Sequence, residues 1–112
     1  MRLCNIFYFD SAHYLPDYCG KCENPHGHTY KLEIVIEDKV KKDGMVLDFT
    51  ILKDIVNREV VDVLDHRNLN EIVDNPTAEH IVEWIWKALA KKLPLHSVKL
   101  WEGEGKWAQK VR

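Results

Sequence analysis

The hydrophobic pattern of the first third of the chain predicts two β-strands. Residues 2–12 are rich in strand-favouring aromatic types and precede a loop that holds Pro16, Gly20 and Pro25. From residue 26 to residue 37, apolar and polar residues alternate, so every second side chain shares one face. That face carries His26, His28, Tyr30, Leu32, Ile34 and Ile36. The pattern therefore predicts a strand that buries its histidine-bearing face.

The middle of the chain has the period of two amphipathic helices. From Thr50 to about Asp65, apolar residues recur at three- and four-residue intervals. A second helix is predicted to begin at Thr77, whose hydroxyl suits an N-cap, and to be ended by Pro94. Between the second strand and the first helix, residues 45–49 are predicted to form a short return segment.

The end of the chain is predicted to form a β-hairpin. Residues 97–102 alternate between apolar and polar, the segment Gly103-Glu104-Gly105 supplies a turn, and residues 106–111 return. The element order is ββααββ, which predicts an α+β fold with two helices on one face of a four-stranded antiparallel sheet. Residues 1–112 are predicted to form a single domain, because domains commonly have ~100 to 150 residues.

Composition and charge exclude several classes of partner. The chain is 46% apolar and 30% charged, with a net charge of −2 and no long basic block, so no nucleic-acid partner is expected. No apolar run approaches the ~18 residues of a membrane span, and no secretory signal is recognisable, so we expect a cytoplasmic protein without a membrane partner. Four Trp, four Tyr and three Phe are a large aromatic load, which favours oligomerisation.

Three of the six histidines are predicted to form a metal site. His26 and His28 share a strand face, and an antiparallel first strand would bring His13 beside them. Three neutral imidazoles suit Zn²⁺, and three protein ligands leave a fourth position open, as in catalytic zinc sites. The alternative is a set of core histidines whose ring nitrogens bond to backbone carbonyl groups.

The cysteines leave more than one interpretation. Cys19 and Cys22 form a CxxC pair that can bind a structural zinc ion together with His26 and His28. A redox pair is less favoured, because no strand–helix unit of the thioredoxin type surrounds it. The favoured interpretation is that Cys22 is a thiol held near the metal, where a lowered pKa makes it a proton-abstracting base.

Two further polar features indicate chemistry. Asp65 can fix the tautomer of the neighbouring His66, which makes this imidazole a candidate acid or base, and a solvated helix end is the alternative. Glu102 falls on the same strand face as Val98 and Leu100, where an apolar residue is expected. A buried carboxylate needs a partner such as the edge of an aminopyrimidine, unless the strand end reaches solvent.

Five segments spread over nearly the whole chain combine into a specific pattern. They are Phe9-Asp10-Ser11-Ala12-His13, Cys22-Glu23-Asn24-Pro25-His26-Gly27-His28, Leu64-Asp65-His66-Arg67-Asn68-Leu69-Asn70, Asn75-Pro76-Thr77-Ala78-Glu79 and the strand ending in Glu102. Together they resemble the 6-pyruvoyltetrahydropterin synthase family, which includes the 6-carboxytetrahydropterin synthases of queuosine biosynthesis.

The resemblance implies a tunnelling fold, in which four-stranded sheets assemble into a barrel. The implied assembly is a homohexamer of two trimers with active sites at subunit interfaces, and the implied substrate is 7,8-dihydroneopterin triphosphate. The implied zinc ligands are His13, His26 and His28. The implied proton-transfer residues are Cys22, Asp65 and His66. The implied substrate-binding residues are Glu102, which anchors the pterin, Thr77 and Glu79.

The residues before the His-Gly-His motif bear on the product. Cys22 stands four positions before His26, as in the enzymes that form 6-carboxy-5,6,7,8-tetrahydropterin, and this lyase activity is the one that the resemblance favours. Glu23 stands three positions before His26, as in a branch that forms 6-hydroxymethyl-7,8-dihydropterin for folate. That branch and the 6-pyruvoyl activity are the enzymatic alternatives, and a zinc-stabilised binding domain is the non-enzymatic one.

Overall fold

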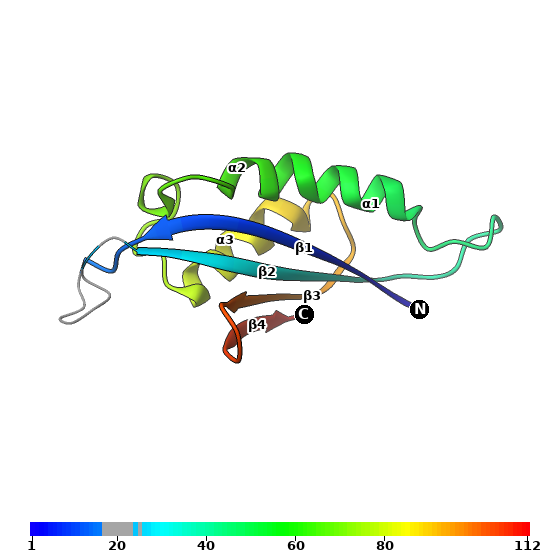
Figure 1. Cartoon of the computed structure of the whole chain (residues 1–112). Helices are drawn as coiled ribbons and strands as arrows, with labels where there is room; N and C mark the ends of the chain where they lie inside the picture. The colour runs from blue at the N-terminus through cyan, green and yellow to red at the C-terminus, as the bar shows by residue number, and fades with distance from the viewer. Residues whose placement is uncertain (17–23, 25) are drawn as a thin grey trace.

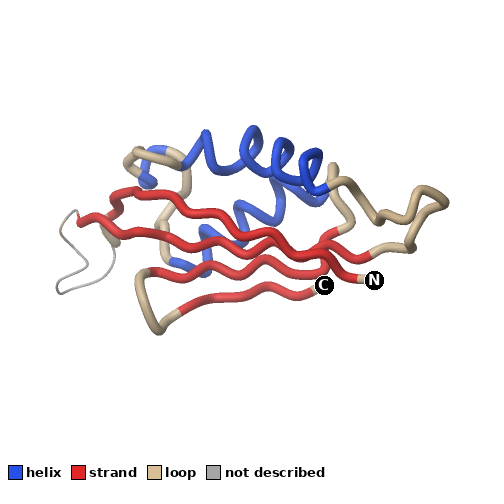
Figure 2. The backbone as a smooth tube through the Cα atoms, turned by 45° about the vertical axis from the view of Figure 1, so that its right-hand side comes forward, coloured by secondary structure: helices blue, strands red, loops and turns tan. Residues whose placement is uncertain are grey.

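A computed structural model, which describes residues 1–16, 24 and 26–112, shows an antiparallel four-stranded sheet with helices on one face (Figure 1, Figure 2). The strands are β1 (Arg2–His13), β2 (His26–Glu37), β3 (Leu95–Glu102) and β4 (Trp107–Val111). They lie in the order β1-β2-β3-β4, and each neighbouring pair is antiparallel. The predicted α+β class and the ββααββ order are confirmed.

The helical layer has two parts. The first comprises α1 (Phe49–Val56), a π-helical turn η2 (Asn57–Val61) and α2 (Asp62–Leu64), which follow one another without a break. A 3-10 turn η3 (Leu69–Glu71) then leads to the second part, α3 (Ala78–Ala90). α3 packs on β3 and β4, whereas the first part packs on β1. In the described part of the chain, none of the helices has the length and apolar character of a membrane span.

The π-helical turn explains an unusual hydrophobic spacing in the first helical segment. Its four fully buried residues stand four positions apart: Leu52, Val56, Val60 and Leu64. Residues at a strict four-residue spacing drift around an α-helix, which has 3.6 residues per turn. The wider η2 turn takes up this drift, so all four side chains reach the same core.

Two predicted boundaries were wrong. Residues 45–49 do not form a return segment, because Asp48 caps α1: its carboxylate accepts a hydrogen bond from the backbone N–H of Thr50 at 2.7 Å. α3 ends at Ala90, before Pro94 is reached, and the chain passes through a turn into β3. Both differences arise from local capping and turn geometry rather than from hydrophobic period.

Among the described residues, helices cover only one of the two faces of the sheet. The helix-facing side carries the apolar core, including the fully buried Tyr30 and Leu32. The opposite side carries no helix among the described residues, and Tyr8 and Trp107 are 63% and 52% exposed there. On the same side, the ammonium group of Lys99 lies 4.0 Å from the Trp107 ring centre. In the single chain, this face of the sheet is therefore exposed and available for contact with a partner.

Candidate functional site

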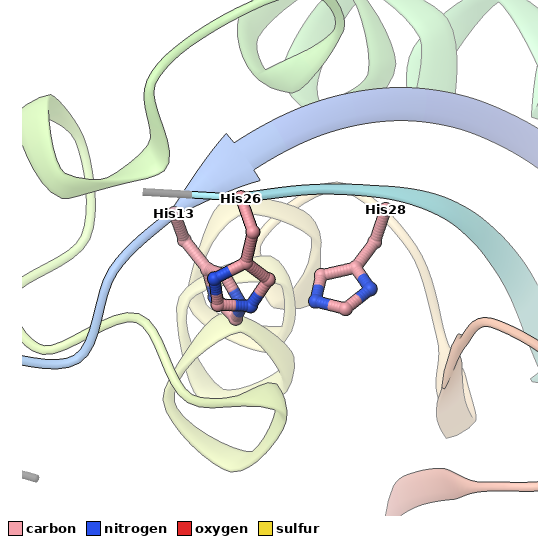
Figure 3. A group of neighbouring side chains, drawn as sticks. All are labelled: His13, His26 and His28. Atoms are coloured by element: carbon pink, nitrogen blue, oxygen red, sulfur yellow. The ribbon is translucent and has the colours of Figure 1, made fainter. Parts of the chain in front are cut away.

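The register of β1 and β2 brings three imidazoles together at one end of the sheet. His13 lies directly opposite His26, and His28 follows two residues along β2 on the same face. The potential ligand nitrogens of the three residues all lie within 4.8 Å of one another. Figure 3 shows the three side chains pointing to the same side of the strands. The predicted proximity of the three histidines is confirmed.

Backbone carbonyl groups determine which ring nitrogens face the centre of this cluster. Nδ1 of His13 lies 2.7 Å from the carbonyl oxygen of Pro76, and Nδ1 of His26 lies 2.8 Å from that of Asn24. A carbonyl oxygen only accepts, so Nδ1 of each ring is the donor in these contacts, and the neutral form of each ring has its lone pair on Nε2.

The two remaining nitrogens face each other. Nε2 of His13 and Nε2 of His26 lie 3.0 Å apart, close to the ~3.3 Å that separates two tetrahedral zinc ligands at ~2.0 Å from the metal. Two facing lone pairs repel, and a shared cation removes this repulsion. This donor set fits a metal ion better than it fits core histidines, whose ring nitrogens would all be satisfied by the protein.

Glu102 contributes a carboxylate beside the cluster. Its Oε1 lies 3.4 Å from Nε2 of His28, and its side chain is 20% exposed. That Nε2 atom is buried and makes no hydrogen bond with the described residues. Burial lowers the pKa of His28, although the charge of Glu102 opposes this effect. Burial therefore favours the neutral imidazole, the form that binds metal.

A cavity of about 660 Å³ opens between the start of α3 and the β3–β4 turn. Its lining includes Thr77, the N-cap of α3, Glu79 from α3, Glu102 from β3 and Lys106 from the turn. It adjoins the cluster, because Glu102 contacts His28. The three predicted substrate-binding residues therefore share one cavity, whose size suits a small organic ligand.

Asp65 and His66 lie together at the outer edge of β1. Oδ1 of Asp65 accepts a hydrogen bond from the backbone N–H of Asp10 at 3.0 Å and lies 2.9 Å from Nδ1 of His66. The backbone N–H of His66 donates to the carbonyl oxygen of Asp10 at 2.7 Å. The His66 side chain is 79% exposed, and no hydrogen bond within the described residues joins it to the three histidines. The structure thus forms the predicted pair but leaves its imidazole in solvent.

The lowered pKa of Asp65 predicts that the stability of the fold depends on pH. The N–H of Asp10 and the neighbouring His66 hold the pKa of Asp65 below its usual range. This stabilisation is present above the unfolded pKa of ~4 and is lost as pH falls through the lower folded value. We expect Asp65→Asn to lower the urea midpoint at about pH 7, and the difference from wild type to shrink below about pH 4. A difference that does not change with pH would contradict this assignment.

Cys19, Cys22 and Glu23 lie outside the described residues. Sequence reasoning missed the backbone carbonyl groups of Pro76 and Asn24, which orient two of the imidazoles. Both are backbone groups, and no side-chain pattern in the sequence marks them.

Comparisons with known proteins connect this site to one family. The family model described as 6-pyruvoyl tetrahydropterin synthase matches residues 2–111. A dihydroneopterin monophosphate aldolase of Pyrococcus furiosus is 48% identical over 99 residues, which cover 85% of this chain and 83% of that protein. A 6-carboxy-5,6,7,8-tetrahydropterin synthase of Haemophilus influenzae is 36% identical, with 90% and 92% covered. The structure of the Caenorhabditis elegans 6-pyruvoyl tetrahydropterin synthase matches with a TM-score of 0.89 at 25% identity, with 100% and 95% covered.

Proposed function

This chain belongs to the 6-pyruvoyl tetrahydropterin synthase family, and on that premise we propose that it is a zinc-dependent lyase that cleaves the side chain of a dihydroneopterin phosphate ester. The favoured reaction converts 7,8-dihydroneopterin triphosphate and one water molecule to 6-carboxy-5,6,7,8-tetrahydropterin, triphosphate and acetaldehyde, a step of queuosine biosynthesis. The observation that carries the proposal is the convergence of His13, His26 and His28 beside a cavity that Glu102 lines.

The three histidines fit a catalytic zinc ion. They provide three nitrogen ligands and leave a fourth position for substrate. When bound there, zinc supplies Lewis-acid stabilisation of the substrate's side-chain oxygens and acidifies the neighbouring protons. The carbonyl groups of Pro76 and Asn24 keep two of the rings oriented with Nε2 inward.

The cavity provides the proposed pterin site. Glu102 accepts hydrogen bonds from the amino group and a ring N–H of the pterin, a bidentate contact that also fixes its orientation. Thr77 and Glu79 line the same cavity. Oε1 of Glu102 lies 3.4 Å from Nε2 of His28, so a pterin held in this way lies beside the three histidines.

Proton transfer is assigned to Cys22, Asp65 and His66. Asp65 accepts from the Nδ1–H of His66, which leaves Nε2 of His66 free to take or give a proton. Since His66 is exposed in the single chain, we assign its imidazole to the active site of a neighbouring copy. The uncovered sheet face, with exposed Tyr8 and Trp107, supports such an assembly. The barrel-shaped hexamer and the cytoplasmic location remain part of this proposal.

Removal of the metal separates this proposal from a zinc-stabilised binding domain. We expect a chelator to abolish turnover while the circular dichroism spectrum stays native, because the hydrophobic core that joins the sheet to the helices contains none of the three histidines. Added zinc should restore the rate. Unfolding of the chain on chelation would instead identify zinc as a structural ion.

A second candidate reaction is favoured by two observations. The Pyrococcus furiosus protein with 48% identity is named a dihydroneopterin monophosphate aldolase, and Glu23 stands three positions before His26. In an aldol cleavage, a base takes the proton of the 2′-hydroxyl, the C1′–C2′ bond breaks, and C1′ is protonated. A 3′-monophosphate would then give 6-hydroxymethyl-7,8-dihydropterin and glycolaldehyde phosphate.

The adjacent Cys22 and Glu23 are proposed to have separable roles in the two reactions. We expect Cys22→Ala to remove the 6-carboxy product and Glu23→Gln to remove the 6-hydroxymethyl product, because each variant lacks one candidate base. Chromatography with mass spectrometry measures both products from one incubation. Loss of both products together in Cys22→Ala would contradict separable roles.

A further inference from the structure

Residues 75–77 connect the three-histidine cluster to the start of α3. The carbonyl oxygen of Pro76, a buried residue, accepts a hydrogen bond from Nδ1 of His13 at 2.7 Å. The preceding carbonyl oxygen, that of Asn75, accepts from Nδ1 of His80 at 2.7 Å and from the backbone N–H of Thr77 at 2.7 Å. Two successive carbonyl groups thus each receive an imidazole, one from the cluster and one from the first turn of α3.

The backbone conformation of residues 75 and 76 depends on hydrogen bonds from neighbouring groups. Asn75 has a φ of 44°, in the left-handed region that non-glycine residues adopt at a cost. The next residue, Pro76, has no N–H with which to anchor the segment. The backbone carbonyl oxygen of Asn75 therefore accepts the hydrogen bonds that fix the peptide plane between Asn75 and Pro76.

From this geometry we propose that His80 is a positioning residue for His13. Its hydrogen bond holds the Asn75–Pro76 peptide, and the Thr77 bond across Pro76 then directs the Pro76 carbonyl toward Nδ1 of His13. The Pro76 carbonyl keeps the His13 proton on Nδ1, so Nε2 is available to the metal. His80 itself is exposed and acts only through this chain of contacts. The inference rests on the proposed zinc centre.

Zinc affinity tests this role. His80→Ala should raise the zinc Kd about 10-fold, because it loosens the Pro76 carbonyl that orients His13, and loss of such an outer partner costs about 10- to 100-fold in metal affinity. His80→Asn places an amide N–H near the position of Nδ1 and should hold Kd within about twofold of wild type. Lys87→Ala, at another exposed position of α3, is the control. Kd is measured by competition with a chelator, and the melting temperature of the metal-free proteins reports separately on folding.

Three outcomes decide between the alternatives. A zinc Kd for His80→Ala equal to that of Lys87→Ala overturns the positioning role while leaving the proposed function intact. Absence of zinc binding by the wild-type protein overturns both. If His80→Ala does not fold, the tautomer of His80 is measured in the wild-type protein by long-range ¹H–¹⁵N spectra. A proton on Nδ1 of neutral His80 supports the proposal, and a proton on Nε2 overturns it.

Discussion

His13→Ala is expected to release zinc and to lower turnover of 7,8-dihydroneopterin triphosphate by about a thousandfold or more. His13 is 1% exposed and supplies one of three nitrogens, so its loss leaves two ligands for a metal that needs three from the protein. A thousandfold loss corresponds to ~4 kcal/mol of transition-state stabilisation, within what a Lewis-acid metal provides. Metal analysis and steady-state rates measure the two effects.

His96→Ala is the matched control for this experiment. His96 lies on β3 and is not a member of the three-histidine cluster. It should keep one zinc per chain and a rate near that of wild type. Circular dichroism of both variants shows whether the fold is retained. Full zinc content and a wild-type rate in His13→Ala would contradict the assignment of the metal centre.

Glu102→Gln is expected to lower kcat/KM about a hundredfold, mainly through a higher KM. The amide presents an NH₂ group where the pterin also presents donors, so one charge-assisted contact is lost and another becomes unfavourable. Hydrogen bonds to charged groups contribute ~1.5 to 3 kcal/mol, which corresponds to about 10- to 150-fold. Initial rates over a range of substrate concentrations separate KM from kcat.

Two further readouts make this result specific. Because Glu102 lies 3.4 Å from His28, zinc content is measured in parallel and should be unchanged. Glu104→Gln changes the same functional group in the adjacent exposed turn and should leave KM near its wild-type value. If Glu102→Gln retains the wild-type KM, another group binds the pterin and the cavity needs a different assignment.

The strands and the three-histidine cluster were predictable because they depend on a simple period. The alternation of residues 26–37 predicted the bounds of β2, and antiparallel pairing of the two strands was expected to bring His13 beside His26 and His28. The helix boundaries were harder to predict from the sequence, since the cap at Asp48 and the π-helical turn at Asn57–Val61 depend on local hydrogen bonding. Hydrophobic period does not encode such bonds.

The supporting contacts of the site could not be predicted, because they involve backbone groups. Every residue carries a carbonyl oxygen, so nothing in the sequence distinguishes that of Pro76, which holds His13. The placement of Asp65 and His66 depends on hydrogen bonds with the backbone of Asp10, 55 residues away from Asp65. The resemblance supplied the role of this pair, and the structure supplied its position at the edge of β1.

Product analysis of the zinc-loaded protein shows whether it is a pterin side-chain lyase. The protein is incubated separately with 7,8-dihydroneopterin triphosphate and with the 3′-monophosphate, and the pterins are separated and identified by mass spectrometry. We expect cleavage of the phosphorylated side chain, with 6-carboxy-5,6,7,8-tetrahydropterin formed from the triphosphate. Mainly 6-hydroxymethyl-7,8-dihydropterin would establish the second candidate reaction in its place. Recovery of both substrates unchanged would contradict the assignment of this site as a pterin side-chain lyase.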